Sequence, residues 1–191
     1  VPADVTTLYI RNADLANDEG WIQSLGTSGY GFDTDLRVAE AYTSYASPEY
    51  IISYSLTQKI TLPAGDYRLT GHAFFRQGLW HDTNPEKSLA QLFAGEEEQA
   101  VATLGGIGLA AYPNNMEATA QEFYNKGNYL NSIDFSVEKD TTITIGFKGT
   151  SDESHSWFIC GEVKLYRMSL GAYQKEYQDL RDELERQAGL A

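Results

Sequence analysis

Residues 50–75 decide the fold, and they read YIISYSLTQKITLPAGDYRLTGHAFF. Apolar and polar side chains alternate on both sides of a Pro-Ala-Gly turn, which is typical of strands that bury one face. Pro63 presets its own φ, and Gly65 can adopt a positive φ. The sequence therefore predicts two strands, joined as a hairpin.

The same alternation continues, more weakly, along the rest of the chain. Further strands are predicted at residues 6–11, 36–42, 89–94, 99–104, 133–137, 143–147 and 157–165. About nine short strands indicate an all-β fold, an antiparallel β-sandwich or a barrel.

One helix is expected to interrupt the strands as a crossover. Asn115 is a suitable N-cap, and Met116, Ala120 and Phe123 share one face of the helix that would follow it. Gly127 can end this helix in the left-handed conformation.

The C-terminal segment has a helical pattern instead. Apolar residues recur at spacings of three and four, namely at Leu170, Tyr173, Tyr177, Leu180 and Leu184. This spacing predicts an amphipathic helix, so we divide the chain into a sandwich over residues 1–168 and a helical appendage over 169–191. The helix could dock on the sandwich, begin a longer helical segment or pair with a second copy as a homodimer.

Composition excludes several classes of protein. With 14 basic and 27 acidic residues, the net charge is −13, which argues against a nucleic-acid partner. No apolar stretch approaches the roughly 20 residues of a transmembrane segment. Cys160 is the one cysteine, so an internal disulfide and a multi-thiolate metal site are excluded, and we expect it to be packed in the last strand. The start at Val1, without a charged-then-apolar leader, suggests a mature or trimmed chain.

Three motifs resemble a known family. They are IRNADL at 10–15 followed by Gly20-Trp21, QKITLPAGDYRL at 58–69 running into AFFRQG at 73–78, and WFICGEVKLY at 157–166. Over residues 6–168 the chain resembles the galactose-binding-like jelly rolls. More narrowly, it resembles the carbohydrate-binding-module-like domains of secreted and surface glycan-foraging proteins of gut bacteria.

This resemblance implies a jelly-roll sandwich that binds sugar without catalysis, with an extracellular or cell-surface location. In that group an Asp-Asn or Asp-Asp pair in the last strand often helps to hold a structural calcium. This chain has Gly161-Glu162 there, which argues against carrying the calcium over. Asn12, Asp14 and Asp18 nevertheless offer hard oxygen ligands for calcium, although a solvated acidic turn explains them equally simply.

Strand order indicates where a site could lie, because successive sandwich strands run mostly antiparallel. One end should gather the connections at residues 43–49, 77–88, 105–127 and 149–156. The other end should gather those at residues 12–35, 63–65, 95–97 and 138–141. Most of the long connections fall in the first group, and long loops on a rigid scaffold often carry function.

Six residues at that first end form a predicted sugar-binding set, namely Trp80, Tyr112, Tyr45, Arg76, His81 and Trp157. A sugar ring stacks its apolar face on an aromatic plane, and its hydroxyls need directional hydrogen-bond partners. We expect Trp80 to be the main stacking platform, although it could simply cover the end of the sandwich. Trp157 could instead pack in the core, and Arg76 could instead form a surface ion pair.

Catalysis is not expected. Glycoside hydrolysis needs two carboxylates, and Asp82 with Asp152 or Glu153 could meet across these loops, but so acidic a chain offers such pairs by chance. The sequence therefore predicts a non-catalytic module for neutral oligo- or polysaccharides, since its negative charge disfavours polyanions. The alternative is a structural or protein-interaction domain that uses the C-terminal helix and binds no glycan.

Overall fold

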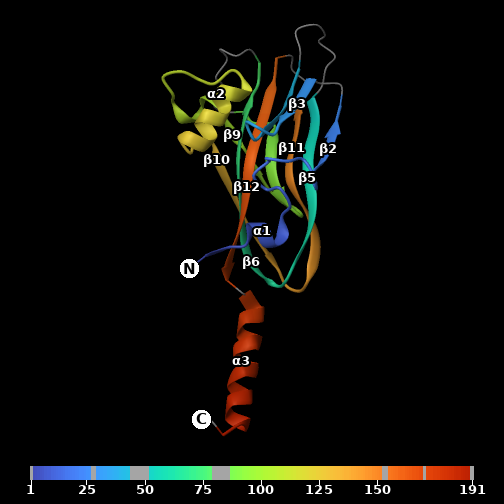
Figure 1. Ribbon diagram of the computed structural model, residues 1–191, viewed down its shortest axis with the longest axis vertical. Coiled ribbons are helices and arrows are strands. Elements are labelled where there is room, and N and C mark those ends of the chain that lie inside the picture. The colour runs from blue at the N-terminus through green and yellow to red at the C-terminus, as the bar shows by residue number, and fades with distance from the viewer. Residues whose placement is uncertain are drawn as a thin grey trace.

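The structure is a computed structural model that describes residues 2–26, 29–43, 52–78, 87–151, 155–169 and 171–189. Two sheets, antiparallel in all but one strand pair, pack face to face as a sandwich (Figure 1). The all-β antiparallel sandwich predicted from the alternating sequence pattern is thereby confirmed.

The first sheet has the strand order β10-β6-β12-β4-β3. Its strands are β10 (Leu130–Val137), β6 (Gly65–Arg76), β12 (Trp157–Ser169), β4 (Val38–Tyr42) and β3 (Gly29–Asp33). Two short strands extend it: β1 (Ala3–Asp4) pairs with β12, and β9 (Ala102–Thr103) pairs in parallel with β6.

The second sheet has the order β2-β5-β11-β7-β8. Its strands are β2 (Ile22–Leu25), β5 (Ile52–Leu62), β11 (Thr141–Ser151), β7 (Ala90–Ala94) and β8 (Glu97–Ala100). From β4 to β7, and again from β10 to β12, each strand lies in the sheet opposite to the preceding one. This alternation between two packed sheets is the arrangement of a jelly roll.

The predicted hairpin is wrong, because β5 and β6 lie in different sheets. The neighbours of β5 are β2 and β11, whereas β6 pairs with β10 and β12. The turn between them crosses from one sheet to the other, and the Tyr67 hydroxyl donates to the Pro63 carbonyl at 2.7 Å. Period-two alternation buries one face in either arrangement, so the pattern cannot identify the partner strand.

Three other segments differ from the sequence prediction. Residues 6–11 begin with a short helix, α1 (Thr6–Tyr9), because Asp4 Oδ1 accepts from both the amide and the hydroxyl of Thr6 at 3.0 and 2.6 Å. Residues 99–104 are divided among β8, β9 and the 3-10 helix η1 (Leu104–Ile107). Residues 12–35, expected as one connection, contain β2 and β3.

The main core lies between the sheets. Its largest fully buried side chains include Leu56, Tyr67, Phe75, Phe147 and Phe158. Cys160 packs there as predicted, and burial raises the pKa of its thiol.

A second apolar cluster covers the outer face of the first sheet. The crossover helix, α2 (Met116–Ala120), continues as the π-helix η2 (Gln121–Asn125) and packs Phe123 against Phe74. The predicted N-cap is confirmed, because Asn115 Oδ1 accepts from the Ala118 amide at 2.7 Å. Gly127 has φ +70°, as its proposed role in ending the helix requires.

Several strands meet at the upper end of the sandwich in Figure 1: β4, β6 and β11 end there, and β12 begins there. The C-terminal helix α3 (Gly171–Gln187) projects from the opposite, lower end (Figure 1). Within the residues that the structure describes, no helix is long and apolar enough to cross a membrane.

Candidate functional site

Three side chains form one row across the upper end of the first sheet. The strand register pairs Tyr42 of β4 with Trp157 of β12, and Trp157 with Arg76 of β6. Paired residues of neighbouring strands point to the same side of a sheet, and this side is the outer face that carries the second cluster. We call Tyr42, Trp157 and Arg76, together with Glu40 one step below on β4, the end row.

Trp157 is a structural member of this row. Its side chain is 4% exposed, and its ring meets Phe74 edge-on with centroids 5.0 Å apart. The indole Nε1 donates to Glu40 Oε2 at 2.7 Å. No face of the indole is open to a sugar ring, so the ligand contact predicted for Trp157 is corrected to its alternative, core packing.

Arg76 fastens three segments of the upper end together. Its guanidinium donates to the Gly78 carbonyl at 2.9 Å, to Asn114 Oδ1 at 2.8 Å and to the His155 carbonyl at 3.0 Å. The same group lies 5.3 Å from the centre of the Trp157 ring. These bonds make Arg76 a positioning residue that holds the connections beside the end row in place.

Tyr42 presents the exposed ring of the row. Its side chain is 39% exposed, and a β-carbon at Gly29 on β3 would collide with its ring carbons. The ring therefore rests against the bare backbone of the neighbouring strand. Tyr42 ends the strand predicted at residues 36–42, but its exposed position depends on pairing with Gly29, which the sequence pattern does not reveal.

Glu40 lies half-buried below Tyr42. Gly31 on β3 is its paired neighbour, and a β-carbon there would be in ordinary contact with Glu40 Oε1 at 3.5 Å. Burial raises the pKa of the Glu40 carboxyl, and the hydrogen bond from Trp157 partly opposes that rise. No donor other than Trp157 reaches this carboxylate among the described residues, so an oxygen remains for a ligand hydroxyl.

The remaining predicted ligand residues fall into two groups. Tyr112 is partly buried against the second cluster, in the connection that Arg76 holds through Asn114. Tyr45, Trp80 and His81 lie outside the described residues, and their roles stay predictions.

The predicted calcium ligands serve the turns that precede β2. Asn12 Nδ2 donates to the Glu19 carbonyl at 2.7 Å, and Asp14 Oδ1 accepts from the Ala16 amide at 3.1 Å. The Asp18 carbonyl accepts from the Trp21 amide at 3.0 Å. In the described part of the chain, no three His, Cys, Asp or Glu side chains are grouped to hold a metal ion, and calcium at Asn12, Asp14 and Asp18 stays a prediction.

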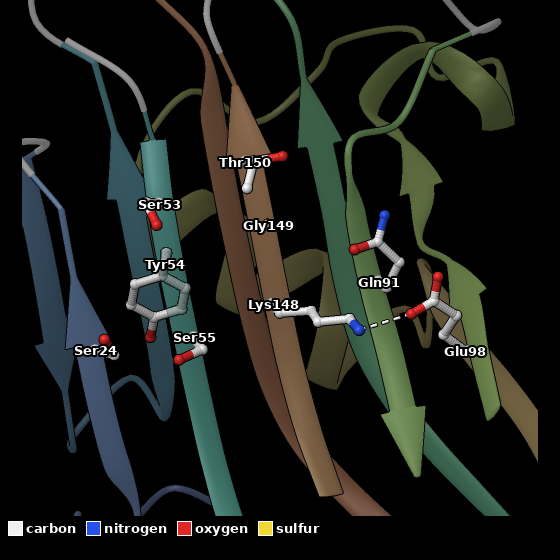
Figure 2. A pocket seen from close by; sticks show the side chains of 9 residues that line it. All are labelled: Ser24, Ser53, Tyr54, Ser55, Gln91, Glu98, Lys148, Gly149 and Thr150. Atoms are coloured by element: carbon white, nitrogen blue, oxygen red, sulfur yellow. Dashed lines mark ion pairs between the residues drawn. The ribbon is translucent and has the colours of Figure 1, made fainter. Parts of the chain in front are cut away.

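A separate hollow of about 380 Å³ lies on the second sheet, and we call it the sheet hollow (Figure 2). It is lined by Ser24, Ser53, Tyr54, Ser55, Gln91, Glu98, Lys148, Gly149 and Thr150. Lys148 Nζ and Glu98 Oε2 form an ion pair of 2.6 Å at one side of it. Ser53 and Ser55 belong to the polar face of the strand predicted within residues 50–75, and a hollow that several strands form together leaves no pattern in the sequence of one strand.

Comparison with known proteins found no matching family model and no matching curated protein. Among solved structures, the chain is similar to TmCBM61 in complex with β-1,4-galactotriose, with 14% identity, a TM-score of 0.45, and 83% of this chain and 97% of that chain covered.

Two further solved structures are similar. The enzymatically active domain of tailspike protein 4 from Bacteriophage CBA120 gives 14% identity and a TM-score of 0.40, over 82% of this chain and 21% of that one. The Stig cyclase Fisc from Fischerella sp. TAU gives 12% identity and a TM-score of 0.41, over 88% of this chain and 99% of that one. Because these proteins differ in chemistry, function has to be argued from the site.

Proposed function

We propose that this protein is a non-catalytic carbohydrate-binding module that binds a neutral glycan at the end row. The observation that carries the proposal is the exposed Tyr42 ring, seated on Gly29, directly above the half-buried Glu40 carboxylate. An aromatic plane can stack on the C–H face of a pyranose, and a carboxylate accepts from the hydroxyls at the ring's rim. The two groups lie on the same face of β4, as one sugar would require.

The net charge and the number of carboxylates support two details of the proposal, namely a neutral ligand and the lack of catalysis. A net charge of −13 disfavours polyanionic glycans, so we propose neutral oligo- or polysaccharides as ligands. Glycoside hydrolysis uses two carboxyl groups that flank the scissile bond, whereas Glu40 is the one carboxylate that the described residues bring into the end row. A module of this kind acts on extracellular or cell-surface glycans, and we propose that location.

A glycan array tests the proposal with wild-type protein, Tyr42→Ala and a matched control, Tyr30→Ala. Tyr30 is an exposed tyrosine on β3 that pairs with Ala41 and points to the other side of the sheet. We expect wild type and Tyr30→Ala to bind the same neutral glycans and Tyr42→Ala to lose them. Calorimetry with and without calcium then tests the predicted ion, and Trp80→Ala tests the predicted platform. Folded wild type that binds no glycan would overturn the proposal.

A second candidate function uses α3 as an interaction surface. Tyr177, Leu180 and Leu184 form a stripe along this helix, and each is more than half exposed. In a parallel pair of helices with this stripe at the seam, Glu176 would lie opposite Arg181 of the other copy, whereas an antiparallel pair would bring Glu176 near Glu183. This charge pattern favours a parallel homodimer, which would place two sandwiches at the same end of the helices.

A further inference from the structure

The sheet hollow lies on a line of residues that crosses four strands of the second sheet. Ser24 on β2 pairs with Ser55 on β5, Ser55 pairs with Lys148 on β11, and Lys148 pairs with Gln91 on β7. Side chains of paired residues share a face, and Figure 2 shows these four around the hollow. This face is opposite to the main core, in which the alternating residues Leu56, Leu92 and Phe147 are buried.

Small side chains explain why the face is hollowed there. Serines occupy the β2 and β5 positions, and Gly149 with Thr150 follows Lys148 on β11. The volume of about 380 Å³ lies within the range of small-molecule sites. The hollow is on the second sheet and the end row on the first, so they are separate surfaces.

The lining determines the chemical class of ligand. Hydroxyl groups and the Gln91 amide can donate and accept, and the charges of Lys148 and Glu98 cancel as a pair. An aromatic platform is absent from this part of the described structure. Tyr54 lines the hollow but is only 3% exposed, and the nearby Phe93 is 8% exposed, with Lys148 Nζ 4.9 Å from its ring centre. A ligand would therefore be held by directional hydrogen bonds rather than by stacking.

We propose that the sheet hollow is a second carbohydrate subsite, which takes a segment of a neutral oligosaccharide by hydrogen bonds alone. The proposal rests on the proposed function, because it assumes a neutral glycan as the ligand of the module. A chain that bends around one edge of the sandwich, or two separate chains, would occupy the two surfaces.

The ion pair between Lys148 and Glu98 is the adjustable part of this subsite. Both side chains are about half exposed, and an exposed pair of this kind opens at little cost. A hydroxyl between them would accept from the ammonium and donate to the carboxylate, which replaces the ion pair by two charge-assisted hydrogen bonds. The ligand's hydroxyl thus meets both a donor and an acceptor at that side of the hollow.

Chemical-shift titration of ¹⁵N-labelled protein tests the proposal, with cellotriose, xylotriose, mannotriose and β-1,4-galactotriose as separate probes. We expect at least one probe to shift the amides of Ser55, Lys148 and Gly149 in wild type. The shifts should persist in Tyr42→Ala and weaken at least tenfold in Ser55→Tyr, which fills the hollow. Lys59→Tyr, on the same strand and face but outside the hollow, should bind like wild type.

The outcomes separate the two proposals. Shifts confined to the segment around Tyr42 and Gly29 would overturn the second subsite and leave the proposed function standing. Shifts at neither surface with any probe would overturn both. If Ser55→Tyr does not fold, Gln91→Ala removes an amide from the hollow without adding bulk, and unchanged affinity at the hollow in that variant would also overturn the subsite.

Discussion

The ring of Tyr42 is seated on Gly29, because a β-carbon at position 29 would overlap Cε2 and Cζ of that ring. The two residues are directly paired across β3 and β4. Glycine leaves one side of the ring supported by backbone, while 39% of the side chain stays exposed. The orientation of the proposed stacking surface is therefore set by a residue that has no side chain.

Gly29→Ala should displace the Tyr42 ring. Its backbone is outside the left-handed region, so alanine meets no backbone strain there and the cost comes from the ring alone. We expect a loss of about 0.5–1.5 kcal/mol in the free energy of unfolding, because the clashing atoms are the far end of a partly exposed side chain that can turn aside. Glycan affinity should fall as in Tyr42→Ala. Chemical denaturation and calorimetry measure the two effects.

A double-mutant cycle provides the control. In the Tyr42→Ala background the steric conflict is absent, so adding Gly29→Ala should be neutral or stabilise the fold by about 0.4–1 kcal/mol. If Gly29→Ala lowers the free energy of unfolding equally in both backgrounds, its effect does not arise from contact with the Tyr42 ring.

Arg76→Gln should loosen the upper end of the sandwich. The substitution removes charged hydrogen bonds to Gly78, Asn114 and His155, each typically about 1.5–3 kcal/mol but not additive. We expect a loss of about 2–4 kcal/mol in unfolding free energy, and faster amide hydrogen exchange at residues 77, 78, 114 and 155.

Arg68→Gln is the matched control for Arg76. Like Arg76, Arg68 donates hydrogen bonds from its guanidinium. Its two bonds, however, go to the exposed Asp134 on the same sheet, and exposed ion pairs of this kind contribute little to the free energy of unfolding. Equal losses in the two variants would contradict the positioning role of Arg76.

The sequence predicted the strands far better than their partners. Alternation locates β5, β6, β10, β11 and β12 because burial of one face is recorded in the order of side chains along a single strand. Pairing is not recorded in this way, and the Pro63 turn therefore looked like a hairpin although it joins two sheets. The N-cap at Asn115 was predictable because capping is local in sequence.

The site was predictable only in part, for the same reason. Arg76 and Trp157 were correctly placed at one end by counting strands, but their partners came from other strands. Glu40 fixes the indole of Trp157, and Gly29 seats Tyr42. Contacts between distant segments of this kind require the sheet register, which a single sequence does not contain.

Leu180→Glu should abolish dimers formed through α3. The substitution places a charge in the middle of the exposed stripe of Tyr177, Leu180 and Leu184, at the seam of a paired helix. We expect wild type to show concentration-dependent association in sedimentation equilibrium and Leu180→Glu to stay monomeric.

The control for this variant is Gln178→Glu, on the same helix but off the stripe. It adds the same charge and should associate like wild type. A wild-type chain that is monomeric throughout the accessible concentration range would refute the homodimer and leave α3 for another partner.

Glu40→Gln should stabilise the protein at neutral pH. Burial raises the pKa of Glu40 above the ordinary glutamate value of 4.5, so the folded state holds its proton more tightly than the unfolded state does. The stabilising contribution of this group is fully present below about pH 4.5 and is lost as pH rises through the raised pKa. Glutamine keeps an oxygen for the Trp157 indole without the buried charge, so its advantage should appear across that window.

Unfolding free energies of wild type and Glu40→Gln, measured from pH 4 to pH 8, test whether wild type loses stability relative to the variant as pH rises. The difference between them should grow with pH and then become constant. Glycan affinity should move in the opposite direction at neutral pH, because the carboxylate is the stronger acceptor for a sugar hydroxyl. A variant that gains stability while losing affinity would identify Glu40 as a charge retained for binding, as expected where a site is kept at some expense of stability. A stability difference that shrinks as pH rises would contradict the raised pKa.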